Sequence, residues 1–283
     1  MTFTSRTVDG PGVALATRDY GGSGPALVLM HGAGMEQSSL EPLAEHLRQH
    51  LHVVTFDFRG HGRTGPAPWT IASAVDDVRA VAEAYGLGVP AVGGHSLGGM
   101  VAVAFGAEHP ACPGVVNIDG HGRGRPEQYV GYDELAVRQA WERQDRRLDR
   151  LTSGSRAVLL RSLLRLLRQP VIGSETAREV TRQSAAIDLL RAYEKLACPL
   201  LVFNAVAPEQ RRWMGLWAGE GLALVAAYRQ GLERDLATLA AERLWTEVVT
   251  VDASHLLIRT HPELVARRIT AFLLPRLEPA RPA

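Results

Sequence analysis

The sequence predicts an α/β fold, in which a mostly parallel central sheet is flanked by helices. Over the first two thirds of the chain, short apolar runs rich in β-branched residues alternate with longer segments of helical periodicity. Several short runs are apolar throughout, which is typical of strands covered by helices on both faces. With 283 residues, 46% of them hydrophobic and 22% charged, the chain can bury a sizeable core.

The first elements are a hairpin followed by alternating strands and helices. Residues Asp9 to Gly12 have the composition of a hairpin turn, and residues 13–20 follow as its second strand. Apolar residues at helical spacing indicate a helix over residues 38–50. We expect further buried strands at residues 26–30, 53–56, 91–93 and 114–118, and further helices at residues 71–85 and 97–107.

The alternation of strands and helices stops after Asp119. Residues 120–197 contain only helical patterns, and strands return at residues 199–203 and 247–251. We therefore expect a core domain of residues 1–119 and 198–283, and a helical cap of residues 120–197 that lies over one edge of the sheet. The helical patterns are residues 135–151, 156–168 and 175–193 in the cap, residues 213–244 between the two later strands, and a last helix after Pro262.

A glycine-flanked serine is the strongest chemical signal in the chain. Gly94-His95-Ser96-Leu97-Gly98 is a G-x-S-x-G motif between a short strand and an apolar helix. A serine on so sharp a turn needs glycine two residues before and two residues after it, because side chains there would collide with neighbouring backbone. A small-residue turn without chemistry is the alternative interpretation. The strand before the motif and the helix after it favour a nucleophile.

Two further motifs join the serine turn to resemble the α/β-hydrolase superfamily. His31-Gly32-Ala33-Gly34 follows the strand that ends at Met30, and Asp57-Phe58-Arg59-Gly60-His61-Gly62-Arg63-Thr64 follows the next strand. The resemblance covers nearly the whole chain outside residues 120–197. It implies acyl transfer through Ser96, with an oxyanion hole formed by the backbone N–H groups of Ala33 and Leu97.

A serine hydroxyl is a weak nucleophile at neutral pH, so a histidine must accept its proton and a carboxylate must orient that histidine. His255 follows the strand of residues 247–251, close to the position that the resemblance assigns to the catalytic histidine. The sequence has ten histidines, and we expect the other nine in packing, capping or surface positions.

The acid departs from the commonest pattern of the superfamily. Most members place an aspartate after the strand that corresponds to residues 199–203, but this chain has Asn204 there and then Glu209. Other members carry the acid after the preceding strand, which here leads into Asp119. We therefore predict Asp119 as the acid and keep Glu209 as the alternative. A turn or cap role is the other interpretation of Asp119, and Asp252 is expected to be structural.

The substrate pocket is expected to have apolar walls supplied by leucines of residues 120–197. Met35, just after the oxyanion loop, is a candidate pocket wall, and His95 is a candidate for packing or hydrogen bonding at the substrate site. Residues 120–197 contain 14 Arg and one Lys against ten Asp and Glu, an excess of five positive charges. Over residues 156–168, where arginines recur on one face of a leucine-rich helical pattern, we favour a solvated arginine face over a leucine core. The alternatives are an acidic carrier protein, an anionic substrate or a membrane surface.

The resulting expectation is a serine hydrolase that acts on a carboxylic ester, lactone or thioester of a small apolar substrate. Epoxide hydrolase and haloalkane dehalogenase activities need a carboxylate nucleophile, and Ser96 argues against both. The same triad also supports C–C bond hydrolysis, haloperoxidase-like activity, and biosynthetic acyl transfer or cyclisation. A ligand receptor on the same scaffold is a further alternative, although it has no need of Ser96 and His255.

Composition excludes or disfavours several other classes. A formal charge of +1 disfavours nucleic acid, because binding to phosphates needs a surplus of positive charge. Cys112 and Cys198 lack CxxC spacing, so we expect no disulfide framework, and no metal or cofactor is implied. The N-terminus lacks the pattern of a secretory signal, and no apolar run approaches the roughly 18 residues that span a bilayer. We therefore expect a cytoplasmic protein that is not an integral membrane protein and acts on a small molecule. No feature indicates an oligomeric state.

Overall fold

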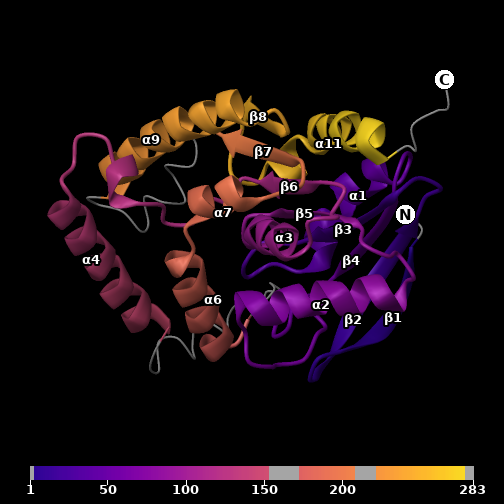
Figure 1. The fold of residues 1–283 in the computed structure, drawn as a ribbon. Helices are drawn as coiled ribbons and strands as arrows, with labels where there is room; N and C mark the ends of the chain where they lie inside the picture. Colours follow the sequence, from indigo (N-terminus) through magenta and orange to yellow (C-terminus); the bar gives the residue numbers. More distant parts are fainter. Residues whose placement is uncertain (1–2, 153–171, 208–220, 278–283) are drawn as a thin grey trace.

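The computed structural model describes residues 3–152, 172–207 and 221–277, and its centre is an eight-stranded sheet (Figure 1). The strand order is β1-β2-β4-β3-β5-β6-β7-β8. The β1–β2 and β2–β4 pairs are antiparallel and the other pairs are parallel, so the predicted mostly parallel sheet is confirmed. The strands are β1 (Thr4–Gly10), β2 (Val13–Gly21), β3 (Ala26–Met30), β4 (His52–Phe56), β5 (Ala91–His95), β6 (Val115–Ile118), β7 (Leu200–Ala205) and β8 (Thr246–Val251).

Helices cover both faces of the sheet, as the apolar strands require. Along β3, Leu27 and Leu29 belong to one core cluster and Val28 and Met30 to the other, because successive side chains of a strand point to opposite faces. The first cluster includes side chains of α1 (Glu41–Leu47) and α11 (Pro262–Leu277), and the second includes side chains of α2 (Ile71–Ala84) and α3 (Leu97–Glu108). The remaining helical segments are η1 (Gln37–Leu40), η2 (Pro126–Gln128), α4 (Glu134–Thr152), α6 (Ser174–Ala186), α7 (Leu189–Lys195), α9 (Gly221–Glu242) and α10 (Leu257–Thr260).

Between β6 and β7 the described residues form helices and no strand, in agreement with the sequence pattern. In Figure 1, α4 and α6 lie at the end of the molecule opposite β1 and β2. The separation of residues 120–197 as a cap domain stays a prediction. The predicted helix over residues 156–168 lies outside the described residues, as does the beginning of the predicted helix over residues 213–244.

One helix expected from the sequence is in fact two. The pattern over residues 175–193 is interrupted at Ile187, which has an extended backbone with ψ of 125°. Asp188 then begins α7 as its N-cap, and its side chain accepts a hydrogen bond from the backbone N–H of Arg191 at 3.1 Å. An aspartate at this position competes with helix continuation by satisfying the first amides of a new helix.

The sheet topology brings the candidate residues to one edge. Ser96 follows β5, Asp119 follows β6 and His255 follows β8. Because parallel strands end at the same edge of a sheet, their carboxyl ends form a shared site. Within the described ranges, no helix is both long and apolar enough to cross a membrane.

Candidate active site

The Ser96 turn is sterically tight, as its glycines predict. Ser96 has a positive φ of 54° and stands between β5 and α3. A Cβ at Gly94 would lie 2.3 Å from the carbonyl carbon of Gly98, and a Cβ at Gly98 would lie 2.5 Å from the carbonyl oxygen of Met30. The turn therefore excludes side chains at the positions two before and two after Ser96. Ser96 itself is half-buried, whereas the residues on either side of it are buried.

The loop of residues His31 to Gly34, which the sequence predicts as the oxyanion loop, lies against this turn. A Cβ at Gly32 would lie 2.9 Å from Nδ1 of His95 and 3.3 Å from Cβ of Ser96, so only glycine allows so close an approach. The next residue, Ala33, is exposed. The half-buried Met35 has its Sδ 3.2 Å from the same Gly32 position. The loop that the sequence assigns to oxyanion binding and pocket wall is thus beside the serine.

His31 connects the oxyanion loop to the turn after β4. Its Nδ1 donates to the carbonyl of Gly32 at 2.8 Å, and its Nε2 accepts from the backbone N–H of Phe58 at 3.1 Å. Burial lowers the pKa of His31 to about 3, with the neighbouring His61 adding to the effect. His31 is therefore neutral near pH 7 and acts as a structural link, which matches the packing role expected for it.

The Asp57 to Thr64 turn is held by buried polar contacts. Asp57 accepts hydrogen bonds from the backbone N–H groups of Gln37 at 2.7 Å and Arg63 at 2.9 Å. Arg59 forms a two-point pair with the buried Asp77, with N–O distances of 2.7 and 2.8 Å. Paired buried charges of this kind fix the loop's position and leave no unsatisfied ion.

The structure brings Asp119 and His255 together. Nδ1 of His255 lies 2.6 Å from Oδ2 of Asp119. Because the carboxylate can only accept, Nδ1 carries the proton and Nε2 is the basic nitrogen of the ring. The side chain of Asp119 is fully buried and that of His255 is 41% exposed, so the histidine faces the solvent side of the site.

Asp119 is kept ionised by several donors. Burial alone would raise the pKa of Asp119, but hydrogen bonds from His121 and His255 and the charge of Arg229 hold it well below its usual range. Its Oδ1 accepts from the backbone N–H of Ala205 at 3.0 Å and from Arg229 at 3.1 Å. Nε2 of His121 lies 3.3 Å from the same oxygen. A carboxylate with this environment can orient an imidazole without taking its proton.

His95 contacts His255 through a hydrogen bond and through its ring. Its Nε2 donates to the carbonyl oxygen of His255 at 2.7 Å, and the two ring centroids are 4.6 Å apart. Burial, followed by the proximity of His255, lowers the pKa of His95 to about 3, so its ring is neutral near pH 7. His95 is 1% exposed. The hydrogen-bonding role predicted for it is present, and a direct contact with substrate stays a prediction.

Three other acidic or basic residues bear on the assignment of the acid. Glu209, the alternative acid, lies outside the described residues, and Asp252 is exposed. Sequence reasoning missed Arg229, which comes from α9 and contacts Asp119. Its place in a long helical pattern gives no chemical signal, so only the fold reveals the contact.

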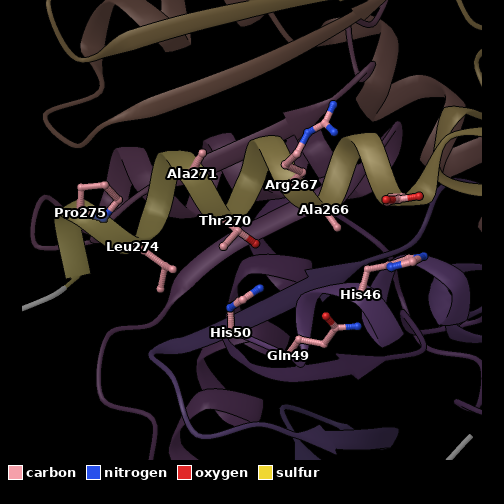
Figure 2. Close-up of a pocket in the computed structure, with 10 residues that line it drawn as sticks. His46, Gln49, His50, Ala266, Arg267, Thr270, Ala271, Leu274 and Pro275 are labelled. Atoms are coloured by element: carbon pink, nitrogen blue, oxygen red, sulfur yellow. The ribbon is translucent and has the colours of Figure 1, made fainter.

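A surface groove of about 540 Å³ is separate from this site. Figure 2 shows it between α11, which contributes Arg267 and Thr270, and the region of α1, which contributes His46 and His50. None of its lining residues belongs to the Ser96 turn, to the oxyanion loop or to the segments that carry Asp119 and His255. Among the described residues, no group of three or more His, Cys, Asp or Glu is arranged to hold a metal ion.

The sequence matches a known family and several curated proteins. The model of the "Alpha/beta hydrolase family" matches residues 27–268. Lipase LipV of Mycobacterium tuberculosis is 39% identical over 100 residues, which are 35% of this chain and 38% of the relative. Pimeloyl-[acyl-carrier protein] methyl ester esterase of Xylella fastidiosa is 38% identical over 100 residues, 34% of this chain and 37% of the relative. The matched segments therefore span little more than a third of the length of these curated relatives.

Solved structures extend the likeness to the whole fold. A thermophilic esterase from Thermogutta terrifontis superposes with a TM-score of 0.70 and 20% identity, over 97% of this chain and 100% of the other. E-2-(Acetamidomethylene)succinate hydrolase superposes with a TM-score of 0.66 and 21% identity, over 96% and 99% of the two chains. At such identities, the structural likeness shows a shared fold.

Proposed function

Because the chain belongs to the alpha/beta hydrolase family, we propose that it is a serine hydrolase that cleaves a carboxylic ester, lactone or thioester of a small apolar substrate. The observation that carries this proposal is the 2.6 Å contact between Nδ1 of His255 and Oδ2 of the buried Asp119. Support for including Ser96 comes from its neighbour His95, which bonds to the carbonyl oxygen of His255, and from Gly120, where a Cβ would lie 2.1 Å from the carbonyl oxygen of Ser96.

The roles follow from the chemistry of each group. Oγ of Ser96 attacks the substrate carbonyl carbon while Nε2 of His255 takes the hydroxyl proton, and Asp119 holds the ring in the required tautomer. The backbone N–H groups of Ala33 and Leu97 stabilise the oxyanion of the tetrahedral intermediate. His255 then protonates the departing alcohol or thiol, which leaves an acyl group on Ser96. Water, deprotonated by His255, attacks that acyl group and releases the acid. No metal or cofactor takes part.

We further propose that residues 120–197 cap the site and that Met35 forms part of the pocket wall. Support for a cap comes from α4 and α6, which lie outside the helical layers of the sheet (Figure 1). The relatives include a lipase, a methyl ester esterase and a protein named Putative carbamate hydrolase RutD, and hydrolysis of an ester proceeds by attack at an acyl carbon. These names support the acyl-transfer chemistry and leave the substrate to be found by a panel.

Several arginines of residues 120–197 are paired with acidic side chains of the same segment, although the net excess of five positive charges is unchanged. Described arginines pair with acidic side chains of the same segment: Arg123 with Asp145, Arg125 with Asp188, Arg138 with Glu134, Arg146 with Glu142, and Arg182 with Glu179. This pairing leaves these arginines less available for docking of an acidic carrier protein, whereas the arginine face expected over residues 156–168 lies outside the described residues. A carrier-bound substrate remains a secondary proposal, supported by the name of the Xylella fastidiosa relatives. It predicts a KM that rises steeply with salt, because screening weakens long-range attraction.

Covalent labelling tests the nucleophile. The wild-type protein should react with a fluorophosphonate probe and should hydrolyse p-nitrophenyl acetate or butyrate. Ser96→Ala and His255→Ala should abolish labelling, because the first removes the nucleophile and the second removes its base. Labelling that survives Ser96→Ala would show that another residue carries the chemistry.

The same assay separates the proposed reaction from its alternatives. Labelling of Ser96 without turnover of any ester, lactone or thioester would favour C–C bond hydrolysis, a haloperoxidase-like reaction, acyl transfer or cyclisation. A panel of 1,3-diketones and of acyl donors with competing amines and alcohols then distinguishes these outcomes. A protein that is neither labelled nor active, and yet binds a ligand, would be a receptor.

A further inference from the structure

We propose that Arg229 is a positioning residue of the active site, whose guanidinium fixes the Asp119 carboxylate and sets the pH range over which His255 accepts a proton. The inference rests on the proposed function, since it concerns the acid of the proposed triad. Arg229 belongs to α9, the helix that connects β7 to β8, and its side chain is 24% exposed. Arg229 therefore approaches the site from a helix in which we recognise no sequence motif.

The guanidinium bridges three acceptors at the carboxyl ends of β6 and β7. Nη1 of Arg229 lies 3.1 Å from Oδ1 of Asp119, 3.1 Å from Oδ1 of Asn204 and 2.9 Å from the carbonyl oxygen of Ala205. Nη2 lies 3.4 Å from Oδ2 of Asp119, the oxygen that also receives His255. Arg229 therefore touches both carboxylate oxygens and anchors them to the end of β7.

Asp119 needs such an anchor for two reasons. Its φ of 55° lies in the left-handed region, which is uncommon for a residue other than glycine, although aspartate enters it more readily than most. Its side chain is also fully buried, and a buried carboxylate is costly unless it is paired and hydrogen-bonded. The backbone N–H of Ala205 supplies one contact at 3.0 Å. Within the described residues, the planar guanidinium of Arg229 is the only arginine or lysine group that pairs with this carboxylate.

The charge of Arg229 also acts on the base. The groups that face His255 and its acid are Asp119 after β6, His121 in the following loop, His95 from β5, and Arg229 from α9. Arg229 places a fixed positive charge beside the carboxylate that pairs with His255, and like charges on the two sides of a carboxylate oppose each other. Removal of the guanidinium removes this opposition. The acid limb of the pH profile of kcat/KM should then move to higher pH, by about one unit at the effective dielectric of a partly exposed pair.

The experiment compares Arg229→Met, Arg229→Lys and Arg234→Met. Arg234 lies on the same helix with a 56% exposed side chain that pairs with Asp235, so it is a matched control for loss of an α9 arginine. Each variant is assayed with p-nitrophenyl butyrate from pH 5 to pH 9, and its thermal unfolding is recorded by circular dichroism. Ser96→Ala is labelled in parallel with the fluorophosphonate probe.

Arg229→Met should lower kcat by about 10 to 100-fold with little change in KM, because a misplaced base slows the chemical step. Its acid limb should shift upward. Arg229→Lys should keep the wild-type acid limb, because it keeps the charge. Its kcat should recover only partly, because one ammonium group lacks the two-point geometry. Arg234→Met should match the wild type.

Three results would overturn the inference: an Arg229→Met profile identical to that of Arg234→Met, a lowered kcat with an unmoved acid limb in Arg229→Met, or full kcat in Arg229→Lys. If Arg229→Met does not fold, Arg229→Lys decides on its own, since a reduced kcat with an unmoved acid limb supports the clamp. Labelling of Ser96→Ala would instead show that the proposed function is wrong. The two failures are therefore distinguishable.

Discussion

Ser96 and Asp119 share a positive φ but are held in place by different means. Among the described residues, they are the non-glycine residues with positive φ, at 54° and 55°. The Ser96 turn is confined by Gly94 and Gly98, which are its near neighbours in sequence. Asp119 is bound instead by groups from β7, from α9 and from the segment after β8, including Arg229 and His255.

The comparison explains why one half of the site is easier to find than the other. Local steric demands leave a local pattern, so the serine turn can be recognised from five consecutive residues. A side chain held by residues 86 to 136 positions away leaves no such pattern. The proposed nucleophile is thus specified by neighbouring residues, and the proposed acid by the assembled fold.

Asp119→Asn should have the largest effect on either side of this comparison. An amide at this position can present its NH₂ group to His255 and favour the wrong tautomer, so kcat should fall by about 10⁴-fold. The carboxyl-specific control is Asp252→Asn, which changes an exposed aspartate close to His255 in sequence and should leave kcat unchanged. Initial rates with p-nitrophenyl butyrate measure both. If Glu209→Gln abolished turnover and Asp119→Asn did not, the acid would be Glu209.

The fold was largely predictable because its inner strands β3, β5, β6 and β7 are buried on both faces. Runs such as residues 26–30 and 114–118 have no competing interpretation as exposed elements, and they appear as β3 and β6. The prediction of a single helix over residues 175–193 was wrong, because the spacing of apolar residues does not reveal that one helix ends before Asp188 and that Asp188 caps the next. Arg229 was missed for a similar reason. The residues next to Arg229 on α9 form no motif that would predict its contact with Asp119.

Gly98→Ala tests the locally held half of the site and should have the next largest effect. The added Cβ would lie 2.5 Å from the carbonyl oxygen of Met30, a backbone atom that cannot move aside cheaply. We expect a loss of about 2 to 4 kcal/mol in the free energy of unfolding. Gly65→Ala is the matched control, because a Cβ at Gly65 meets nothing within 4 Å. Urea titration measures both, and equal midpoints for the two variants would remove the steric account of the motif.

His31 gives the smallest effect and tests how the locally held half depends on pH. Its pKa is lowered to about 3 in the folded protein, whereas the ring titrates near 6.5 when the chain is unfolded. Between these values the unfolded chain binds a proton that the folded chain does not, so stability falls as pH decreases below about 6.5. From pH 6.5 to pH 4.5 this single ring should cost about 2 to 3 kcal/mol.

His31→Asn should therefore be less stable than the wild type at pH 7, because it disturbs the link to Phe58, and should lose less stability on acidification. His50→Asn, at an exposed position after α1, serves as the surface comparison. Urea unfolding at pH 7.0, 5.5 and 4.5 gives the slope for each protein. A slope that is the same in His31→Asn and in the wild type would mean that the buried ring is not the source of acid sensitivity. The remaining slope in His31→Asn should come largely from His95, the other buried ring beside Ser96, whose pKa is also lowered to about 3.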